Sequence, residues 1–315
     1  MAETGSATKQ PLAREQVRAL LREAVGEERD AVELSDGEFT VCYATEDVVL
    51  KVWPEEGTPL LTHEEGLVHA EIDVCRRAPE AGFPAPGLVH VDTSRRLLDR
   101  DWIVMTRLPG VTVPHAGEDV DVDVDRELGE AFARLHEVTG DAFGYTGRSA
   151  LQAATWRDAL ARMICAVLDD AARFDVSLPF ARDDVTAALA AAAPALDEVT
   201  RPALVHFDAW SGNVLVADGR LSGVIDGERS FYGDPLAEWA MLVFGREPAD
   251  RPGLVAGYGG LELDEAARMR LDLYRFYLFA IVLVEEAPRR YDPVRRAPAR
   301  TRAAEGALAA LARLA

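Results

Sequence analysis

A two-residue turn constrains the fold of this chain more than any other feature. Asp218-Gly219 stands between two apolar segments, and this arrangement is a strong signal for a tight β-hairpin. In the register that such a turn sets, Asn213 lies opposite Val224. Asn213 and Asp226 then become diagonal neighbours, with their backbones roughly 7–8 Å apart. Their side chains are therefore expected to converge at the open end of the hairpin.

A third polar residue, Asp208, lies in the loop that enters the same end of the hairpin. Turn chemistry would explain any one of these residues alone, but Asn213 is the chain's one asparagine. Lysine is almost as rare, with Lys9 and Lys51 against 32 arginines. An asparagine retained against such a bias is expected to do what its substitutes cannot. Two side-chain oxygens, together with substrate phosphates, suit Mg²⁺, so we predict Asn213 and Asp226 as its ligands.

Hydrophobic periodicity divides the chain into two parts of different character. Residues 1–105 are expected to hold a helix over 11–25, then a sheet, and a second helix over 63–78. Residues 106–110 break both periodicities and mark the boundary, after which residues 111–315 are mainly helical. We expect strands at 32–34, 39–43, 48–52, 88–91 and 102–105, and later helices at 155–173, 184–192, 235–244, 264–286 and 300–314.

Charge and composition exclude several classes of partner. The formal charge is −20, and an acidic surface repels nucleic acids and anionic membranes. The same charge favours a cationic small substrate, although it would equally serve solubility. The longest apolar run, residues 276–284, is too short to cross a bilayer, and the first ten residues have no apolar core of a signal peptide. Three scattered cysteines are expected as buried free thiols in a reducing cytosol, so we predict a cytoplasmic protein. We expect it to be a monomer or a homodimer.

The motif His206-x-Asp208-x4-Asn213, followed by Ile225-Asp226, resembles the aminoglycoside phosphotransferase family within the protein-kinase-like superfold. The resemblance covers most of residues 30–245. It implies an α+β, bilobal fold with a small antiparallel-sheet N-lobe, a hinge at 106–110 and a large helical C-lobe. Three other segments are similar to the family: residues 105–110, 132–136 and 233–235.

The resemblance implies a role for each residue of the motif. Asp208 would orient the acceptor hydroxyl and take its proton, while Asn213 and Asp226 would hold Mg²⁺ on the nucleotide phosphates. Further contacts to the nucleotide, either ATP or GTP, would come from a loop over the phosphates and from the hinge. These residues would be Ser35, Asp36 and Gly37 in the loop, and Met105, Thr106, Arg107 and Leu108 at the hinge.

Lys51 lies among apolar strand residues, where an unpaired ammonium is costly. One explanation is purely structural: Lys51 lies on an edge strand and its ammonium reaches water. The resemblance implies instead that Lys51 contacts the α- and β-phosphates and pairs with a helix carboxylate. Glu71 matches the family pattern best, and Glu64 and Glu65 are alternatives.

The acceptor is the least determined part of the predicted site. Phe207, Ala209 and Gly227-Glu228 depart from the residues usual in the family, and residues 210–212 resemble the related fructosamine kinases. We expect a pocket walled by the loop after Asp226 and by helices at 150–180 and 264–286. Its candidate substrate-binding residues are Trp210, Glu228, Asp234, Glu238 and Glu285.

The chain is therefore expected to be an O-phosphotransferase that uses Mg²⁺ and a nucleotide to modify a small hydroxylated molecule, with an antibiotic as the first choice. A metabolic kinase acting on a ketosamine, a choline-like amine or a sugar is the alternative. A non-catalytic binding module with the same fold is the third hypothesis. It would require the loss of Lys51, Asp208, Asn213 or Asp226, and all four are present.

Overall fold

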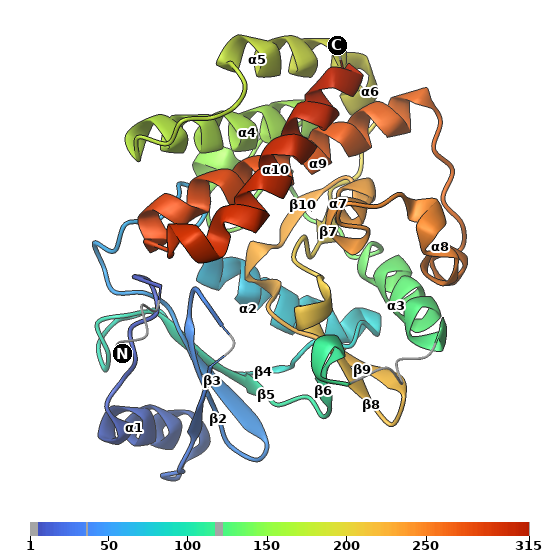
Figure 1. The fold of residues 1–315 in the computed structure, drawn as a ribbon. Coiled ribbons are helices and arrows are strands. Elements are labelled where there is room, and N and C mark those ends of the chain that lie inside the picture. The colour runs from blue at the N-terminus through green and yellow to red at the C-terminus, as the bar shows by residue number, and fades with distance from the viewer. Residues whose placement is uncertain (1–5, 36, 117–121, 315) are drawn as a thin grey trace.

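The computed structural model of the protein describes residues 6–35, 37–116 and 122–314. An antiparallel sheet is built from the first third of the chain, and a helical part is built from the rest (Figure 1), as predicted. The strands are β1 (Val32–Leu34), β2 (Val41–Ala44), β3 (Val48–Val52), β4 (Leu88–Asp92), β5 (Trp102–Thr106), β6 (Val111–Thr112), β7 (Ala203–Val205), β8 (Val214–Ala217), β9 (Arg220–Val224) and β10 (Phe231–Gly233). The helices are α1 (Arg14–Val25), α2 (Leu67–Arg77), α3 (Val122–Leu135), α4 (Trp156–Arg173), α5 (Arg182–Ala191), α6 (Ala193–Asp197), α7 (Glu238–Leu242), α8 (Pro252–Tyr258), α9 (Glu265–Arg289) and α10 (Pro293–Leu314).

The N-terminal sheet has the strand order β1-β2-β3-β5-β4, so β3 lies at its centre. Side chains alternate between the faces of a strand. Leu50 and Val52 of β3 are buried in one core with Leu20 and Leu21 of α1. Lys51, between them, points to the other face, where its ammonium contacts a carboxylate of α2. The alternation of β3 thus delivers one cation to the side of the sheet that faces the rest of the molecule.

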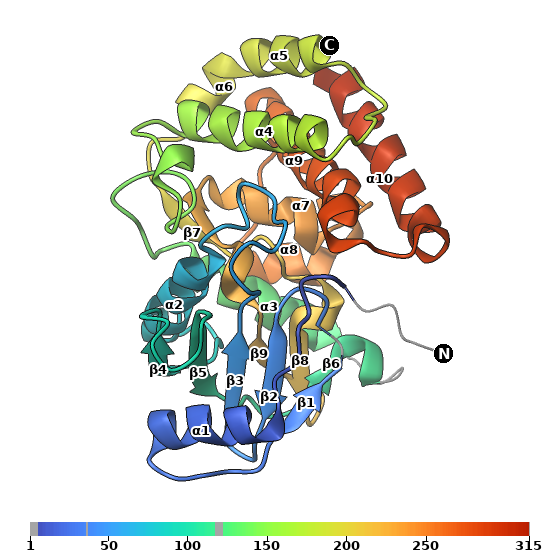
Figure 2. The ribbon, with the colours of Figure 1, turned by 90° about the vertical axis from the view of Figure 1, so that its left-hand side faces the viewer.

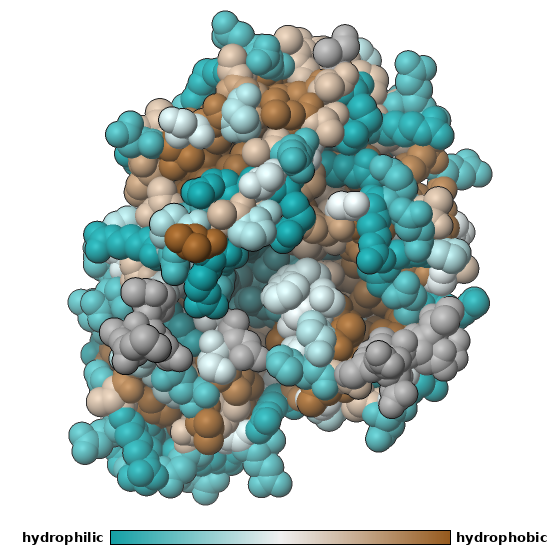
Figure 3. All heavy atoms as spheres, viewed as in Figure 1, coloured by the Kyte–Doolittle hydropathy of each residue, from teal (hydrophilic) through white to brown (hydrophobic). Residues whose placement is uncertain are grey.

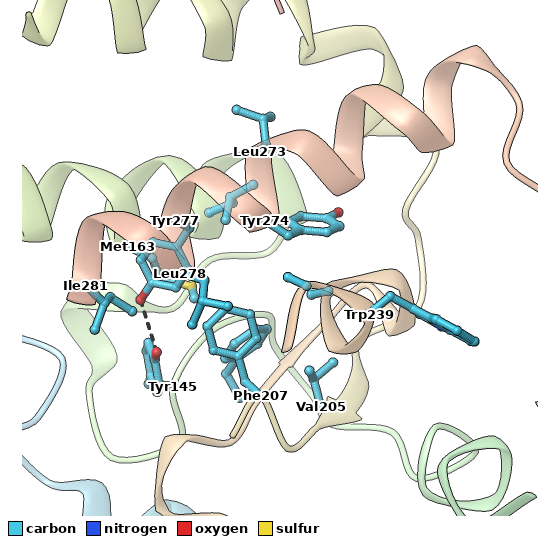
Figure 4. Packing of buried hydrophobic residues seen from close by; sticks show 14 of the residues in the cluster. Tyr145, Met163, Val205, Phe207, Trp239, Leu273, Tyr274, Tyr277, Leu278 and Ile281 are labelled. Atoms are coloured by element: carbon cyan, nitrogen blue, oxygen red, sulfur yellow. Dashed lines mark hydrogen bonds between the residues drawn. The ribbon is translucent and has the colours of Figure 1, made fainter. Parts of the chain in front are cut away.

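Helix α9 runs through the helical part and carries several of its large buried side chains, among them Tyr274, Phe276 and Tyr277. Figure 4 shows Tyr277 and Leu278 of α9 above Phe207, with the hydroxyls of Tyr145 and Tyr277 3.0 Å apart. The rings of Phe207 and Tyr277 have centroids 5.7 Å apart. The loop that carries the catalytic candidate Asp208 is therefore packed directly on α9.

Several predicted boundaries shift for identifiable reasons. Helix α2 begins at Leu67 rather than at residue 63, because Gly66 adopts φ 87°, a left-handed conformation outside the helix. Helix α1 begins at Arg14, after Ala13 in an extended conformation. The helix predicted at 235–244 is a short 3₁₀ turn followed by α7, and α10 begins at Pro293 instead of residue 300. The short strands β6, β7 and β10 and helix α8 were not predicted.

The hairpin register predicted from the sequence is correct next to the turn, where Ala217 pairs with Arg220, and is displaced by one residue farther along the strands. Asp218-Gly219 does form the turn between β8 and β9, but the register shifts within the ladder, as at a β-bulge. Val224 consequently pairs with Val214, and the backbone carbonyl of Asn213 accepts from Ile225 at 2.9 Å.

Polar and charged side chains cover much of the face in Figure 3, with apolar atoms in smaller separate areas. Among the described helices, none is long and apolar enough to cross a membrane. All three cysteines are free, as predicted, but only Cys75 is buried, since Cys42 is half-buried and Cys165 is exposed.

The segment between β3 and α2 (residues 53–66, the β3–α2 segment) leaves the sheet and lies beneath α4 and α9 (Figure 2). Thr62 donates its backbone N–H and its hydroxyl to Asp170 of α4 at 2.6 and 2.8 Å. Glu64 pairs with Arg289 of α9. Gly66 packs so closely on Gly147 that a Cβ on Gly147 would lie 2.2 Å from the Gly66 carbonyl oxygen. This segment fastens the sheet region to the helical part.

We expect Gly147→Ala to lower the free energy of unfolding by about 1–3 kcal/mol, because its methyl group would overpack the backbone of Gly66. Gly87→Ala is the matched control, since the nearest atoms to a Cβ there are 3.6 Å away, an ordinary contact. Urea unfolding of both variants checks this. Equal stabilities would contradict the close packing of the β3–α2 segment.

His63, in the same segment, is 1 % exposed, and neither ring nitrogen has a hydrogen-bond partner. Burial lowers its pKa to about 4. The unfolded chain therefore binds a proton first as the pH falls below about 6.5, and the folded state loses stability until about pH 4. Between pH 7.5 and 5, the free energy of unfolding should therefore fall by about 2 kcal/mol less in His63→Phe than in the wild type.

Urea unfolding at the two pH values measures this difference. The exposed His69, changed to Phe, is the control. An equal pH dependence in His63→Phe and wild type would contradict the assignment of a neutral buried imidazole.

Candidate active site

The loop that carries Asp208 is held from behind by a buried glutamate. Glu238 is fully buried, and its two carboxylate oxygens accept from the backbone N–H groups of His206 and Phe207 at 2.7 and 3.0 Å. Phe207 has φ 62°, a left-handed conformation that is rare for a bulky residue. The ring of His206 accepts from the N–H of Asp208 at 3.3 Å. These bonds give the loop a strained but fixed shape, and His206 supports the loop through its ring.

Asn213 closes the loop from the other side. Its side-chain NH₂ donates to the backbone oxygen of Asp208 at 2.8 Å and lies 3.4 Å from the Asp208 carboxylate. Asn213 also accepts from Ile225, the residue before Asp226. Asn213 therefore links the two parts of the site: its side chain donates to Asp208, and its backbone oxygen accepts from the residue before Asp226.

Asp208 lies in a nearly closed environment. Burial raises the pKa of its carboxyl, Arg229 opposes that rise, and Asp226 adds to it, so that the pKa is about 7. The guanidinium Nε of Arg229 is 3.7 Å from the Asp208 carboxylate. A carboxylate with such a pKa can accept a proton near neutral pH.

Lys51 is the centre of the second half of the site. Its ammonium lies 2.8 Å from Glu71, 2.5 Å from Asp226 and 3.0 Å from Glu228. Burial alone would lower the pKa of Lys51, but the three carboxylates raise it well above its ordinary value. Glu71 belongs to α2, and Asp226 and Glu228 follow β9, so one ammonium joins three elements distant in sequence.

Three carboxylates around a single ammonium leave an excess of negative charge. Oxygens of Glu71, Asp226 and Glu228 all lie within 4.8 Å of one another. Burial and these neighbours raise the pKa of Glu228 to about 8, while Lys51 counters burial at Asp226 and lowers its pKa. Hard oxygen donors with unbalanced charge fit a divalent cation such as Mg²⁺. The residues present therefore fit the predicted metal, with Asp226 common to this carboxylate group and to the predicted pair.

A line of alternating charges extends from Asp208 into the molecule. Arg229 donates to Glu285 of α9 at 2.7 Å, Glu285 lies 3.3 Å from Arg289, and Arg289 pairs with Glu64. Arg229 and Arg289 were not among the predicted site residues, because only carboxylates and Trp210 were expected near the acceptor. The position of Arg229, three residues after Asp226, was the available signal.

The model of the phosphotransferase enzyme family matches residues 24–274. The chain belongs to this family. Hygromycin-B 4-O-kinase of Escherichia coli is 30% identical over 187 residues, which are 55% of this chain and 51% of that protein. The chain thus spans about half the length of the curated relative that it matches.

Solved structures share the fold over nearly the whole chain. A thermostable mutant of aminoglycoside phosphotransferase APH(4)-Ia, in ternary complex with AMP-PNP and hygromycin B, has a TM-score of 0.66 at 22% identity, covering 95% of this chain and 98% of that one. A putative fructosamine-3-kinase from Thermobifida fusca also has a TM-score of 0.66 at 22% identity, covering 93% and 98%. At these identities the likeness establishes the fold alone.

The segments predicted to bind the nucleotide lie beside the sheet. Met105 and Thr106 end β5, and the N–H groups of Thr106 and Arg107 already donate to Gly87 and Asp47 at 2.8 Å. Leu108 packs against Gly223 of β9. In the predicted phosphate loop, Ser35 accepts from Lys9 through its backbone oxygen and Gly37 is exposed, while Asp36 lies outside the described residues.

The predicted acceptor residues are scattered among different environments. Trp210 is 50 % exposed, next to the Asp208 loop. Glu228 instead contacts Lys51, and Glu285 is paired with Arg229. Asp234 caps the turn at Leu236 and accepts from Arg270 and Tyr274.

Glu238 is bonded to the Asp208 loop, so both Asp234 and Glu238 have partners within the protein. The structure therefore does not support their predicted contact with an acceptor. The physical reason is that a carboxylate in a protein core needs donors on each oxygen, and these two have found them within the fold.

Glu238→Gln should lower the free energy of unfolding by about 1–3 kcal/mol, because one amide oxygen cannot serve both N–H groups and a buried donor is left unpaired. Urea unfolding measures the loss. Glu137→Gln, at an exposed position, is the control with the same chemical change. A Glu238→Gln protein as stable as the control would show that the Asp208 loop does not depend on this carboxylate.

Proposed function

We propose that this phosphotransferase moves the terminal phosphoryl group of ATP or GTP to a hydroxyl of a small molecule. The observation that best supports this proposal is the buried ammonium of Lys51, which lies among three carboxylates. These are Glu71, Asp226 and Glu228, next to the loop of Asp208 and Asn213. Phosphoryl transfer needs positioning and charge neutralisation more than covalent chemistry, and this site offers both.

Each residue has a definite task in the proposal. Asp208 orients the acceptor hydroxyl and receives its proton, which its raised pKa allows. Asn213 and Asp226 would hold Mg²⁺, which would neutralise charge on the nucleotide phosphates when bound. Lys51 would contact those phosphates from β3. Residues 1–105 would form the nucleotide-binding lobe, 106–110 the hinge and 111–315 the catalytic and acceptor-binding lobe.

The proposed acceptor is a hydroxylated antibiotic, and the cytoplasm the proposed location. The relative that phosphorylates hygromycin B favours this choice. A metabolic ketosamine is the second candidate, favoured by the fructosamine-3-kinase-like neighbour. A cationic acceptor recognised by free carboxylates is less well supported than the sequence suggested, since Glu285 and Asp234 are paired with arginines of this chain.

The proposal is tested by ADP or GDP release from purified protein with Mg²⁺, in the presence of hygromycin B, other aminoglycosides, fructosamines, choline and neutral sugars. At least one compound should stimulate release and appear as a phosphorylated product by mass spectrometry. Nucleotide binding without transfer to any compound would leave the binding-module hypothesis in place of the enzyme.

Asp208→Ala should lower turnover about 10²-fold or more while nucleotide binding persists, because it removes a positioned base. Asp226→Ala should instead abolish the Mg²⁺-dependent part of nucleotide binding. Calorimetry with and without a chelator separates the two effects. Unchanged turnover in Asp208→Ala, or unchanged Mg²⁺-dependent binding in Asp226→Ala, would overturn the corresponding assignment.

A further inference from the structure

The chain's other lysine, Lys9, holds the loop predicted to cover the nucleotide phosphates. Its ammonium lies 3.2 Å from the backbone oxygen of Leu34 and 3.0 Å from that of Ser35. The Glu33 carboxylate is 3.7 Å away. The side chain of Lys9 is only 14 % exposed, and charge-assisted hydrogen bonds of this kind are stronger than neutral ones. Lys9 therefore fixes the backbone at the start of the loop.

The end of the loop is held from two directions. The Thr8 hydroxyl, which is buried, donates to the backbone oxygen of Glu38 at 3.1 Å. The Glu38 carboxylate pairs with Arg296 of α10. The guanidinium of Arg289 lies 5.0 Å from the centre of the Phe39 ring, within the range of a cation–π contact.

The segment that supplies these bonds, residues 7–10, is itself anchored. Ala7 donates its N–H to the backbone oxygen of Arg289 at 3.0 Å. The backbone oxygen of Gln10 accepts from Arg100 at 2.7 Å, and its side-chain oxygen accepts from the N–H of Glu55 at 2.9 Å. Lys9 thus acts on the loop from a fixed base rather than from a free chain end.

We propose that Lys9 is a positioning residue for nucleotide binding, which keeps the backbone around Leu34 and Ser35 in its binding arrangement before the nucleotide arrives. A loop that must be ordered on binding loses conformational entropy at that moment, and prior ordering removes this cost. Lys9 contacts the loop carbonyls and not the substrate, so its effect falls on nucleotide affinity and not on the chemical step. This inference rests on the proposed nucleotide-dependent function.

The test uses the full chain and calorimetry with Mg²⁺ and AMP-PNP. Lys9→Met keeps the length of the side chain but removes its charge and donors, and should raise Kd about 10-fold. Lys9→Arg retains both and should stay within about threefold of wild type. Arg22→Met removes one cation from an exposed position on α1 that pairs with Glu28, and is the matched control.

With an acceptor in hand, Lys9→Met should raise KM for the nucleotide about 10-fold and leave kcat within about twofold. Thr8→Val, which removes only the hydroxyl bond to Glu38, should raise Kd by about threefold and serves if Lys9→Met does not fold. The role of Lys9 would be overturned by an unchanged Kd in Lys9→Met, or in Thr8→Val where that variant replaces it. An equal rise of Kd in Lys9→Met and Lys9→Arg would overturn it as well. A wild-type protein that binds neither AMP-PNP nor its guanine counterpart GMP-PNP would instead overturn the proposed function.

Discussion

The buried ammonium of Lys51 is the interaction on which the site depends. A cation in the interior is stable only when its charge is matched and its hydrogens are bonded. Here the match comes from Glu71 of α2 and from Asp226 and Glu228 after β9. The strand, the helix and the loop must all be in place before the charge of the ammonium is matched. The site therefore forms only when the sheet packs onto the helical part.

Local signals predicted the parts of this site that depend on a few neighbouring residues. The Asp218-Gly219 turn is set by its own backbone preferences, and the scarcity of lysine singled out Lys51 before any partner was known. The register beyond the turn was not predictable in the same way. Gly223 packs against the side chain of Leu108, and that packing involves a residue more than a hundred positions earlier.

The acidic residues show where sequence reasoning ends. Composition gives the sign of a side chain but not the partner that satisfies it. Glu285 is paired with Arg229, 56 positions away, and Asp234 with Arg270, 36 positions away. Both carboxylates therefore serve the interior, whereas the sequence pattern alone made them equally good candidates for an acceptor pocket. Only the tertiary fold distinguishes an acidic binding surface from an internally neutralised one.

The β3–α2 segment has a mechanical consequence. Two parts of a protein that are joined by a single linker can rotate about it. Here the β3–α2 segment is a second connection, because it is bonded to α4 through Asp170 and to α9 through Arg289. Swinging the sheet region away would have to break the bonds between Thr62 and Asp170 and the pair of Glu64 and Arg289 together. The segment therefore favours entry and exit of small molecules through local movements of side chains and loops.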